Sequence, residues 1–115
     1  MADMDDSTQA SHFSFFITSR RPQLAELCQR HHARTLHLFG SATRADFRPA
    51  DSDLDFLVDF DGALPPAAYS QAFFALKQGL EDLFNRPVDL LTPDALRNPY
   101  LRRRIESEQL ALYGA

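Results

Sequence analysis

Apolar and polar residues alternate along residues 53–60, and this alternation predicts a β-strand with one apolar face and one acidic face. Four apolar residues share one parity, namely Leu54, Phe56, Val58 and Phe60. Three acids share the other parity, namely Asp53, Asp55 and Asp59, with Leu57 as the exception. Because successive side chains of a strand point to opposite faces of a sheet, we expect the apolar set to face the core.

Apolar residues recur at helical spacing in two other segments. Residues at i, i+3, i+4 and i+7 after Pro22 predict an amphipathic helix over about residues 22–33, namely Leu24, Leu27, Cys28 and His31. The segment from Tyr69 to Phe84 keeps the helical period over four turns and gives the strongest helix prediction in the chain. Residues 61–66 before it carry turn residues.

Shorter signals complete the predicted secondary structure. Asn98 before Pro99 is typical of a helix start, so we expect a last helix with Leu101 and Ile105 on its apolar side. The Phe-rich residues 12–17 are predicted to form a helical lead-in. Short strands are expected at residues 35–39 and 88–91, whereas the apolar residues 110–113 fit a helix or a strand.

The alternation of strands with helices predicts a small α/β (α+β) domain. We expect a mixed sheet of three to four strands covered by helices, in a single domain over residues 12–115. Residues 1–11 are polar and lack an apolar period, so we expect them to form a disordered tail.

Composition and charge exclude several classes of protein. Among 115 residues, 44% are hydrophobic, which is typical of a globular domain. The formal net charge of −4 disfavours direct nucleic-acid binding, because proteins that bind nucleic acids present a basic face. Cys28 is the single cysteine and cannot form an intrachain disulfide. No apolar run approaches the roughly 18 residues of a membrane span, so we expect a cytoplasmic protein without membrane contact.

Three features indicate metal and nucleotide chemistry. Asp53 and Asp55 lie two residues apart and therefore point to the same side of the predicted strand, and Asp89 interrupts the apolar strand at residues 88–91 in a way that suggests a buried acid. Carboxylates held together repel unless a cation lies among them, and hard oxygen ligands suit Mg²⁺. Gly40 and Ser41, where a strand turns into a helix, suit a phosphate contact, and Arg44 adds positive charge.

Other sites fit the sequence less well. An EF-hand loop starting at Asp51 would place Phe56 where Gly is required and Gly62 where Glu is required. No P-loop motif is present. Neighbouring helical positions lie about 100° apart, so His31 and His32 favour a surface and half-buried pair over a metal site. The basic run 102–104 fits a solvated helix face, but also a contact with nucleotide phosphates or an acidic partner.

The run LFGSATRADFRPADSDLDFLVDF, followed by VDLL and NPYLRRRIESE, resembles the minimal nucleotidyltransferases of the DNA polymerase beta superfamily. The resemblance implies their fold, with Asp53 and Asp55 as metal ligands and Asp89 as the third acid. It also implies that Gly40 and Ser41 hold the triphosphate of ATP beside a pair of Mg²⁺ ions. Eleven residues separate Ser41 from Asp53, one more than the family's usual pattern, and Ala45 replaces a common Gly.

The same resemblance implies an acceptor and a partner. Family members of this length pair with a helical HEPN protein, often as the antitoxin of a HEPN toxin, and attach AMP to its tyrosine. We therefore expect an ATP-dependent protein adenylyltransferase that forms a hetero-oligomer with its partner. Two alternatives stay open, namely a non-catalytic binding module that neutralises its partner by contact and nucleotidyl transfer to a small molecule.

Overall fold

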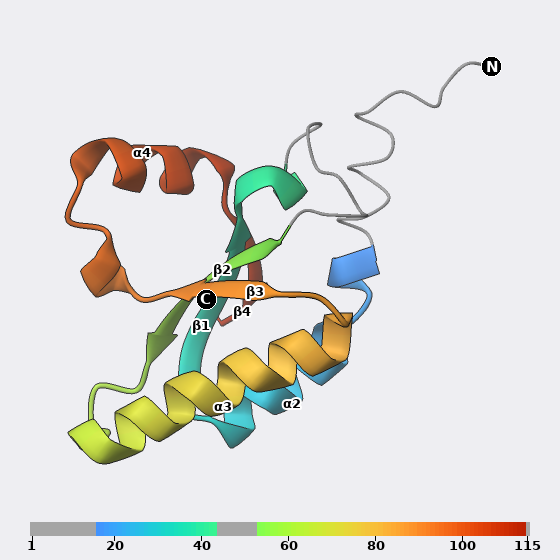
Figure 1. Ribbon diagram of the computed structural model, residues 1–115, viewed down its shortest axis with the longest axis vertical. Coiled ribbons are helices and arrows are strands. Elements are labelled where there is room, and N and C mark those ends of the chain that lie inside the picture. The colour runs from blue at the N-terminus through green and yellow to red at the C-terminus, as the bar shows by residue number, and fades with distance from the viewer. Residues whose placement is uncertain (1–15, 44–52, 115) are drawn as a thin grey trace.

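The computed structural model of the chain describes residues 16–43 and 53–114, so the expected tail at residues 1–11 and Arg44 lie outside the described residues. Figure 1 shows the order of the helices and strands along the chain. In chain order these are α2 (Arg21–Arg30), β1 (Ala33–Phe39), the 3-10 helix η1 (Gly40–Thr43), β2 (Leu54–Phe60), α3 (Pro66–Phe84), β3 (Val88–Leu91), the 3-10 helix η2 (Pro93–Ala95), α4 (Pro99–Glu108) and β4 (Leu110–Tyr113).

The four strands form one mixed sheet in the order β3-β2-β1-β4, which confirms the predicted fold class. Strand β1 pairs antiparallel with both β2 and β4. Strand β2 pairs parallel with β3, and helix α3 connects the two. The ambiguous residues 110–113 are therefore a strand, because pairing with β1 satisfies their backbone groups.

Helices α2 and α3 cover one face of the sheet, and α4 lies across the opposite face (Figure 1). The apolar parity of β2 points toward α2 and α3, as predicted, and its residues belong to the main core with Leu24, Leu76 and Leu80. Cys28 is also fully buried there, which confirms its predicted core position. This cluster supplies most of the apolar burial that stabilises the domain.

A second, smaller apolar cluster lies under α4. Its buried members are Phe39, Leu96 and Ile105. Leu57, the exception to the alternation in β2, packs against this cluster together with Leu91 and Leu101. The acidic face of β2 is thus apolar where α4 covers it, which explains why the alternation is incomplete.

Several element boundaries differ from the prediction. Strand β1 begins at Ala33, two residues before the predicted start at residue 35. Helix α2 ends at Arg30, three residues early, because His32 adopts a left-handed backbone conformation with φ 65° that a helix cannot continue. Strand β2 begins at Leu54, so Asp53 lies immediately before the strand. Helix α3 begins three residues before Tyr69, since Pro66 occupies a first-turn position and its fixed φ suits a helix start.

Two other helix predictions agree with the structure where it describes the chain. The Asn98 side chain accepts hydrogen bonds from the backbone N–H groups of Tyr100 and Leu101, which confirms the predicted N-cap of α4. Residues 16–18 are helical and Ile17 is fully buried, in agreement with the end of the predicted lead-in, whereas residues 12–15 lie outside the described part of the chain.

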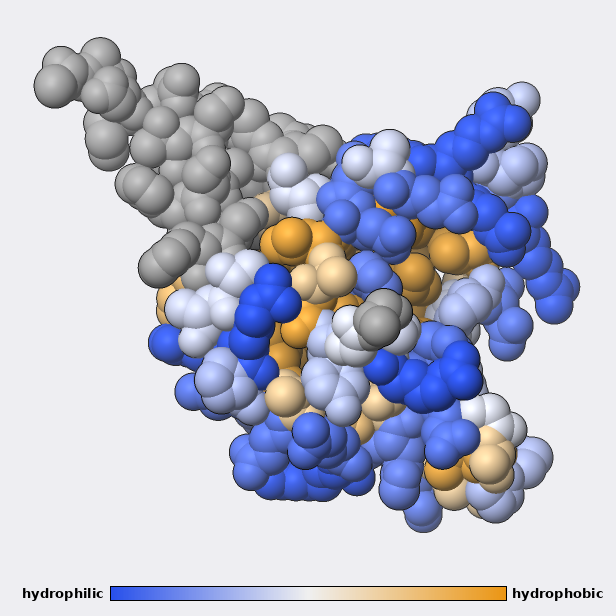
Figure 2. All heavy atoms as spheres, turned by 180° about the vertical axis from the view of Figure 1, so that it is seen from behind, coloured by the Kyte–Doolittle hydropathy of each residue, from blue (hydrophilic) through white to orange (hydrophobic). Residues whose placement is uncertain are grey.

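Apolar side chains also reach the surface at the level of the sheet. Figure 2, which views the molecule from behind, shows them as a band across the middle between hydrophilic side chains above and below.

Over residues 16–43 and 53–114, no helix has both the length and the apolar character needed to cross a bilayer.

Candidate active site

Two of the three candidate acids lie side by side on neighbouring strands. Asp55 is half-buried on β2, and in the parallel register it pairs with Asp89 of β3. In the antiparallel register, Asp55 pairs with Phe39 of β1. Phe39, Asp55 and Asp89 therefore form one row across three strands, on the face that α4 covers in part.

Asp53 and Asp89 are both exposed to solvent. The expectation that Asp89 is buried was wrong, because β3 is an edge strand and the cluster under α4 reaches only as far as Leu91. Within residues 16–43 and 53–114, no set of three His, Cys, Asp or Glu side chains lies close enough to hold a metal ion. The register thus brings the backbones of Asp55 and Asp89 together, but the three carboxylates do not converge on one point.

Gly40 brings the backbone of η1 against the candidate acid of β2. Its φ of +79° lies in the left-handed region that favours glycine. A Cβ added at this position would collide with Oδ2 of Asp55 and lie 3.1 Å from its Cγ. Glycine is therefore required here both by the backbone conformation and by the close approach of the Asp55 carboxylate.

Strand β1 is followed directly by the 3-10 helix η1, and the residues after Thr43, where the sequence predicts that a helix starts, lie outside the described part of the chain. The Thr43 hydroxyl donates a hydrogen bond of 2.7 Å to the Gly40 carbonyl and closes this turn. The backbone of Ser41 lies in the same turn, directly after Gly40. The predicted neighbours Gly40, Ser41 and Asp55 are thus brought to one end of the sheet.

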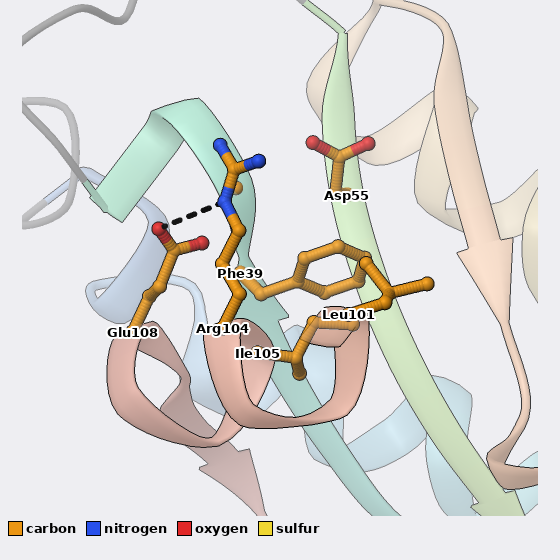
Figure 3. A pocket seen from close by; sticks show the side chains of 7 residues that line it. Phe39, Asp55, Leu101, Arg104, Ile105 and Glu108 are labelled. Atoms are coloured by element: carbon orange, nitrogen blue, oxygen red, sulfur yellow. Dashed lines mark ion pairs between the residues drawn. The ribbon is translucent and has the colours of Figure 1, made fainter. Parts of the chain in front are cut away.

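A pocket of about 230 Å³ opens between this turn and α4 (Figure 3). Its described lining comes from the end of β1, from η1, from β2 and from α4, namely Phe39, Gly40, Asp55, Leu101, Arg104, Ile105 and Glu108. Nε of Arg104 lies 3.7 Å from Oε2 of Glu108 in an i, i+4 ion pair. The pocket therefore combines a candidate metal ligand, a close backbone turn and a guanidinium.

Glu108 is the lining residue that the sequence interpretation missed, and Arg104 was not separated from its two basic neighbours. The signal was present, because residues 101, 104, 105 and 108 follow the i, i+3, i+4, i+7 spacing of one helical stripe. Arg102 and Arg103 lie outside this stripe and are exposed. His31 is half-buried and His32 exposed, as predicted, and burial lowers the pKa of His31.

Comparison with known proteins identifies the family of the chain. Residues 21–112 match the family model described as a nucleotidyltransferase domain. A protein of Methanocaldococcus jannaschii that is named a protein adenylyltransferase is 32% identical over 82 residues, which cover 71% of this chain and 79% of the relative.

Solved structures give the same fold. The structure of a minimal nucleotidyltransferase has a TM-score of 0.61 and 30% identity, and the match covers 96% of this chain and 98% of the other. A chain from the complex of a tri-AMPylated HEPN toxin of Shewanella oneidensis with an MNT antitoxin has a TM-score of 0.57 at 19% identity, covering 86% and 73%. The family match over residues 21–112 and the shared fold confirm the resemblance seen in the motifs, and this chain belongs to the nucleotidyltransferase domain family.

Proposed function

We propose that this nucleotidyltransferase moves AMP from ATP to a tyrosine hydroxyl of a HEPN-type partner protein and thereby acts as its antitoxin. The observation that carries the proposal is the row of Asp55 and Asp89 on neighbouring strands, next to the Gly40 turn. The Methanocaldococcus jannaschii relative is named a protein adenylyltransferase, which supports the same reaction. The MNT antitoxin with the same fold lies in a complex with a HEPN toxin, which supports the same class of partner.

The residues present fit Mg²⁺ by their chemistry. Carboxylate oxygens are the ligands that Mg²⁺ prefers, and Asp53, Asp55 and Asp89 would hold it at the end of the sheet. When bound, Mg²⁺ neutralises negative charge on the phosphates of the nucleotide. Like charges repel, so the carboxylates stay apart when no cation lies among them. We expect Mg²⁺ to remove this repulsion and to draw them together.

The residues of the site then have further roles in the transfer, including a second one for Asp89. Gly40 allows the η1 backbone to approach the phosphates closely, and Ser41 and Arg44 are assigned to hold them. Asp89 is exposed on the edge strand, where a hydroxyl from a partner can reach it. We assign it to orient this hydroxyl and accept its proton while the oxygen bonds to the α-phosphorus and pyrophosphate leaves.

A docked protein suits this site as the acceptor. The pocket next to Asp55 encloses about 230 Å³, whereas pockets that enclose a small molecule usually measure roughly 300–1,000 Å³. A partner that presents one tyrosine in line with the α-phosphorus supplies the orientation that an open site lacks, which is worth several kcal/mol in a transfer reaction.

The proposal is tested by incubating the full chain with its HEPN-type partner, ATP and Mg²⁺, followed by intact-mass spectrometry. We expect the partner to gain one or more AMP units, and tryptic fragments to place them on tyrosine. The Asp53→Asn variant should abolish the addition. The matched Asp94→Asn variant, which changes an exposed acid on η2, should leave it unchanged.

Two results would contradict the proposal in different ways. If Asp53→Asn neutralises the partner as well as the wild type does and no AMP is added in either case, the chain is a non-catalytic binding module. If AMP appears on a small molecule and never on the partner, the acceptor class is wrong while the transfer chemistry stands.

A further inference from the structure

We infer that Arg104 binds the polyphosphate of the nucleotide and that Glu108 is the positioning residue that holds Arg104 in place. This inference rests on the proposed function, since it assigns a ligand group to a residue of the same pocket. Arg104 and Glu108 both lie on α4, which forms the far wall of the pocket. Neither residue belongs to the sequence motifs of the candidate acids or of the Gly-Ser turn.

The helical stripe of α4 separates Arg104 from the rest of the basic run. Leu101 and Ile105 of this stripe pack into the small cluster under α4, and Ile105 is buried. Arg104 lies on the same side of the helix and lines the pocket opposite Gly40 and Asp55. Arg103 is exposed and does not belong to the described lining. Position on the helix therefore gives Arg104 a contact that its neighbour lacks.

The ion pair with Glu108 sets the direction of the guanidinium. The Glu108 side chain is 13% exposed and the Arg104 side chain is 62% exposed, so a nearly buried acid holds a cation that solvent and ligands can reach. The pair uses Nε, and Figure 3 shows the two terminal nitrogens turned away from Glu108. A guanidinium held by one edge keeps its terminal donors for a second, bidentate partner.

Charge and size point to phosphate as that partner. Asp55 lies on the opposite wall, and an acidic site requires additional positive charge to accept a polyanion. Arg104 is the basic residue among the described lining residues. The volume of about 230 Å³ is enough for part of a nucleotide only, and the turn at Gly40 is where the phosphates are proposed to lie. We therefore assign Arg104 to the phosphate chain and not to the base or the ribose.

Calorimetric titration of the full chain with AMP-PNP and with AMP, both with Mg²⁺, tests this assignment. Loss of a charge-assisted hydrogen-bond pair should weaken AMP-PNP binding to Arg104→Gln by roughly tenfold to a hundredfold. The affinity for AMP, which lacks the β and γ phosphates, should change by less than about threefold. Arg104→Lys should recover part of the loss because the charge remains, and the matched variant Arg103→Gln should bind like the wild type.

A double-mutant cycle tests the role of Glu108. Glu108→Gln should weaken AMP-PNP binding when Arg104 is present and should have no further effect in the Arg104→Gln background. A merely structural role of Glu108 would give the same loss in both backgrounds. Thermal unfolding of each variant checks that the fold is intact.

The outcomes separate this inference from the proposed function. If the wild type binds AMP-PNP and Arg104→Gln binds it equally well, the assignment of Arg104 is wrong and the proposed function stands. If Arg104→Gln weakens AMP and AMP-PNP by the same factor, Arg104 contacts the nucleoside part and the assignment to the phosphates is also wrong. If the wild type does not bind AMP-PNP with Mg²⁺, both proposals are wrong.

Discussion

The two faces of the sheet differ in how completely they are covered. On the side of α2 and α3, the main cluster holds eighteen buried residues, whereas among the described residues the cluster under α4 holds three. We call the side under α2 and α3 the dense face and the side under α4 the sparse face. Asp55 and Phe56 are adjacent in β2, yet Asp55 points to the sparse face and Phe56 to the dense face. The difference places apolar packing on one side of the strand and the candidate chemistry on the other.

This separation has a physical reason. Carboxylates that must meet a metal, a nucleotide and an incoming hydroxyl need access from solvent, and a covering helix would desolvate them. Helix α4 leaves Asp89 exposed but still packs on Leu57 and Leu91. The sheet can therefore be stabilised from one face while the other keeps an open site.

The largest effect is expected from Asp55→Asn, which changes the sparse face only. Loss of a proposed metal ligand removes several kcal/mol of charge stabilisation, so AMP transfer should fall at least about a thousandfold. The free energy of unfolding should change little by comparison, because the variant leaves the main apolar cluster intact. Transfer is measured by mass spectrometry and stability by urea unfolding.

Asp59→Asn is the control for Asp55→Asn on the same strand. Asp59 has the same parity in β2 but forms an ion pair of 2.9 Å with Arg34, away from the pocket. Exposed ion pairs contribute up to about 1 kcal/mol, so this variant should transfer AMP normally. Equal loss of activity in both variants would show that the acidic face acts through its overall charge and not through Asp55.

Phe56→Ala tests the dense face and should cost roughly 3–5 kcal/mol of stability, because it removes a fully buried ring and leaves a cavity. Urea unfolding gives the free energy of unfolding, and Phe74→Ala serves as the control because its side chain is exposed on α3. That control should lose less than about 1 kcal/mol. A loss in Phe56→Ala no larger than in the control would mean that the dense face does not dominate stability.

Gly40→Ala changes a residue that contributes to both stability and nucleotide binding, so both should decrease. The left-handed backbone and the collision with Asp55 should cost about 1–3 kcal/mol of stability. Nucleotide binding should weaken as well, because either the turn or the Asp55 carboxylate has to move. Unfolding and AMP-PNP titration of the variant measure the two effects, and normal values of both would refute the close approach.

The smallest effect concerns the thiol on the dense face. Burial raises the pKa of Cys28 to about 12 from an ordinary value of 9.0, so the folded protein keeps its proton at pH 8. A thiol reagent should therefore label Cys28 slowly in the native protein and rapidly in urea. Because the pKa is raised on folding, stability is full below pH 9 and declines as the pH rises from about 9 toward 12. Equal labelling rates in both states would show that this face is open to solvent.

Much of the local structure follows from the sequence alone. The parity of residues 53–60 was enough to predict a strand with Asp55 and Phe56 on opposite faces. The pair Asn98 and Pro99 predicted the start of α4, because capping and a fixed proline φ act within one turn. These features depend on neighbours in the chain, and local stereochemistry decides them.

The arrangement of the site depends on contacts between distant segments. The parallel pairing of Asp55 with Asp89 depends on the path of α3 between the two strands, and the exposure of Asp89 depends on how far α4 extends. Arg104 and Glu108 reach the Gly40 turn only because β4 pairs with β1 and thereby places the end of α4 there. The sequence by itself determined which residue types and strand faces carry the chemistry, whereas the tertiary structure decided which of them meet, because strand register and helix packing are set by burial across the whole domain.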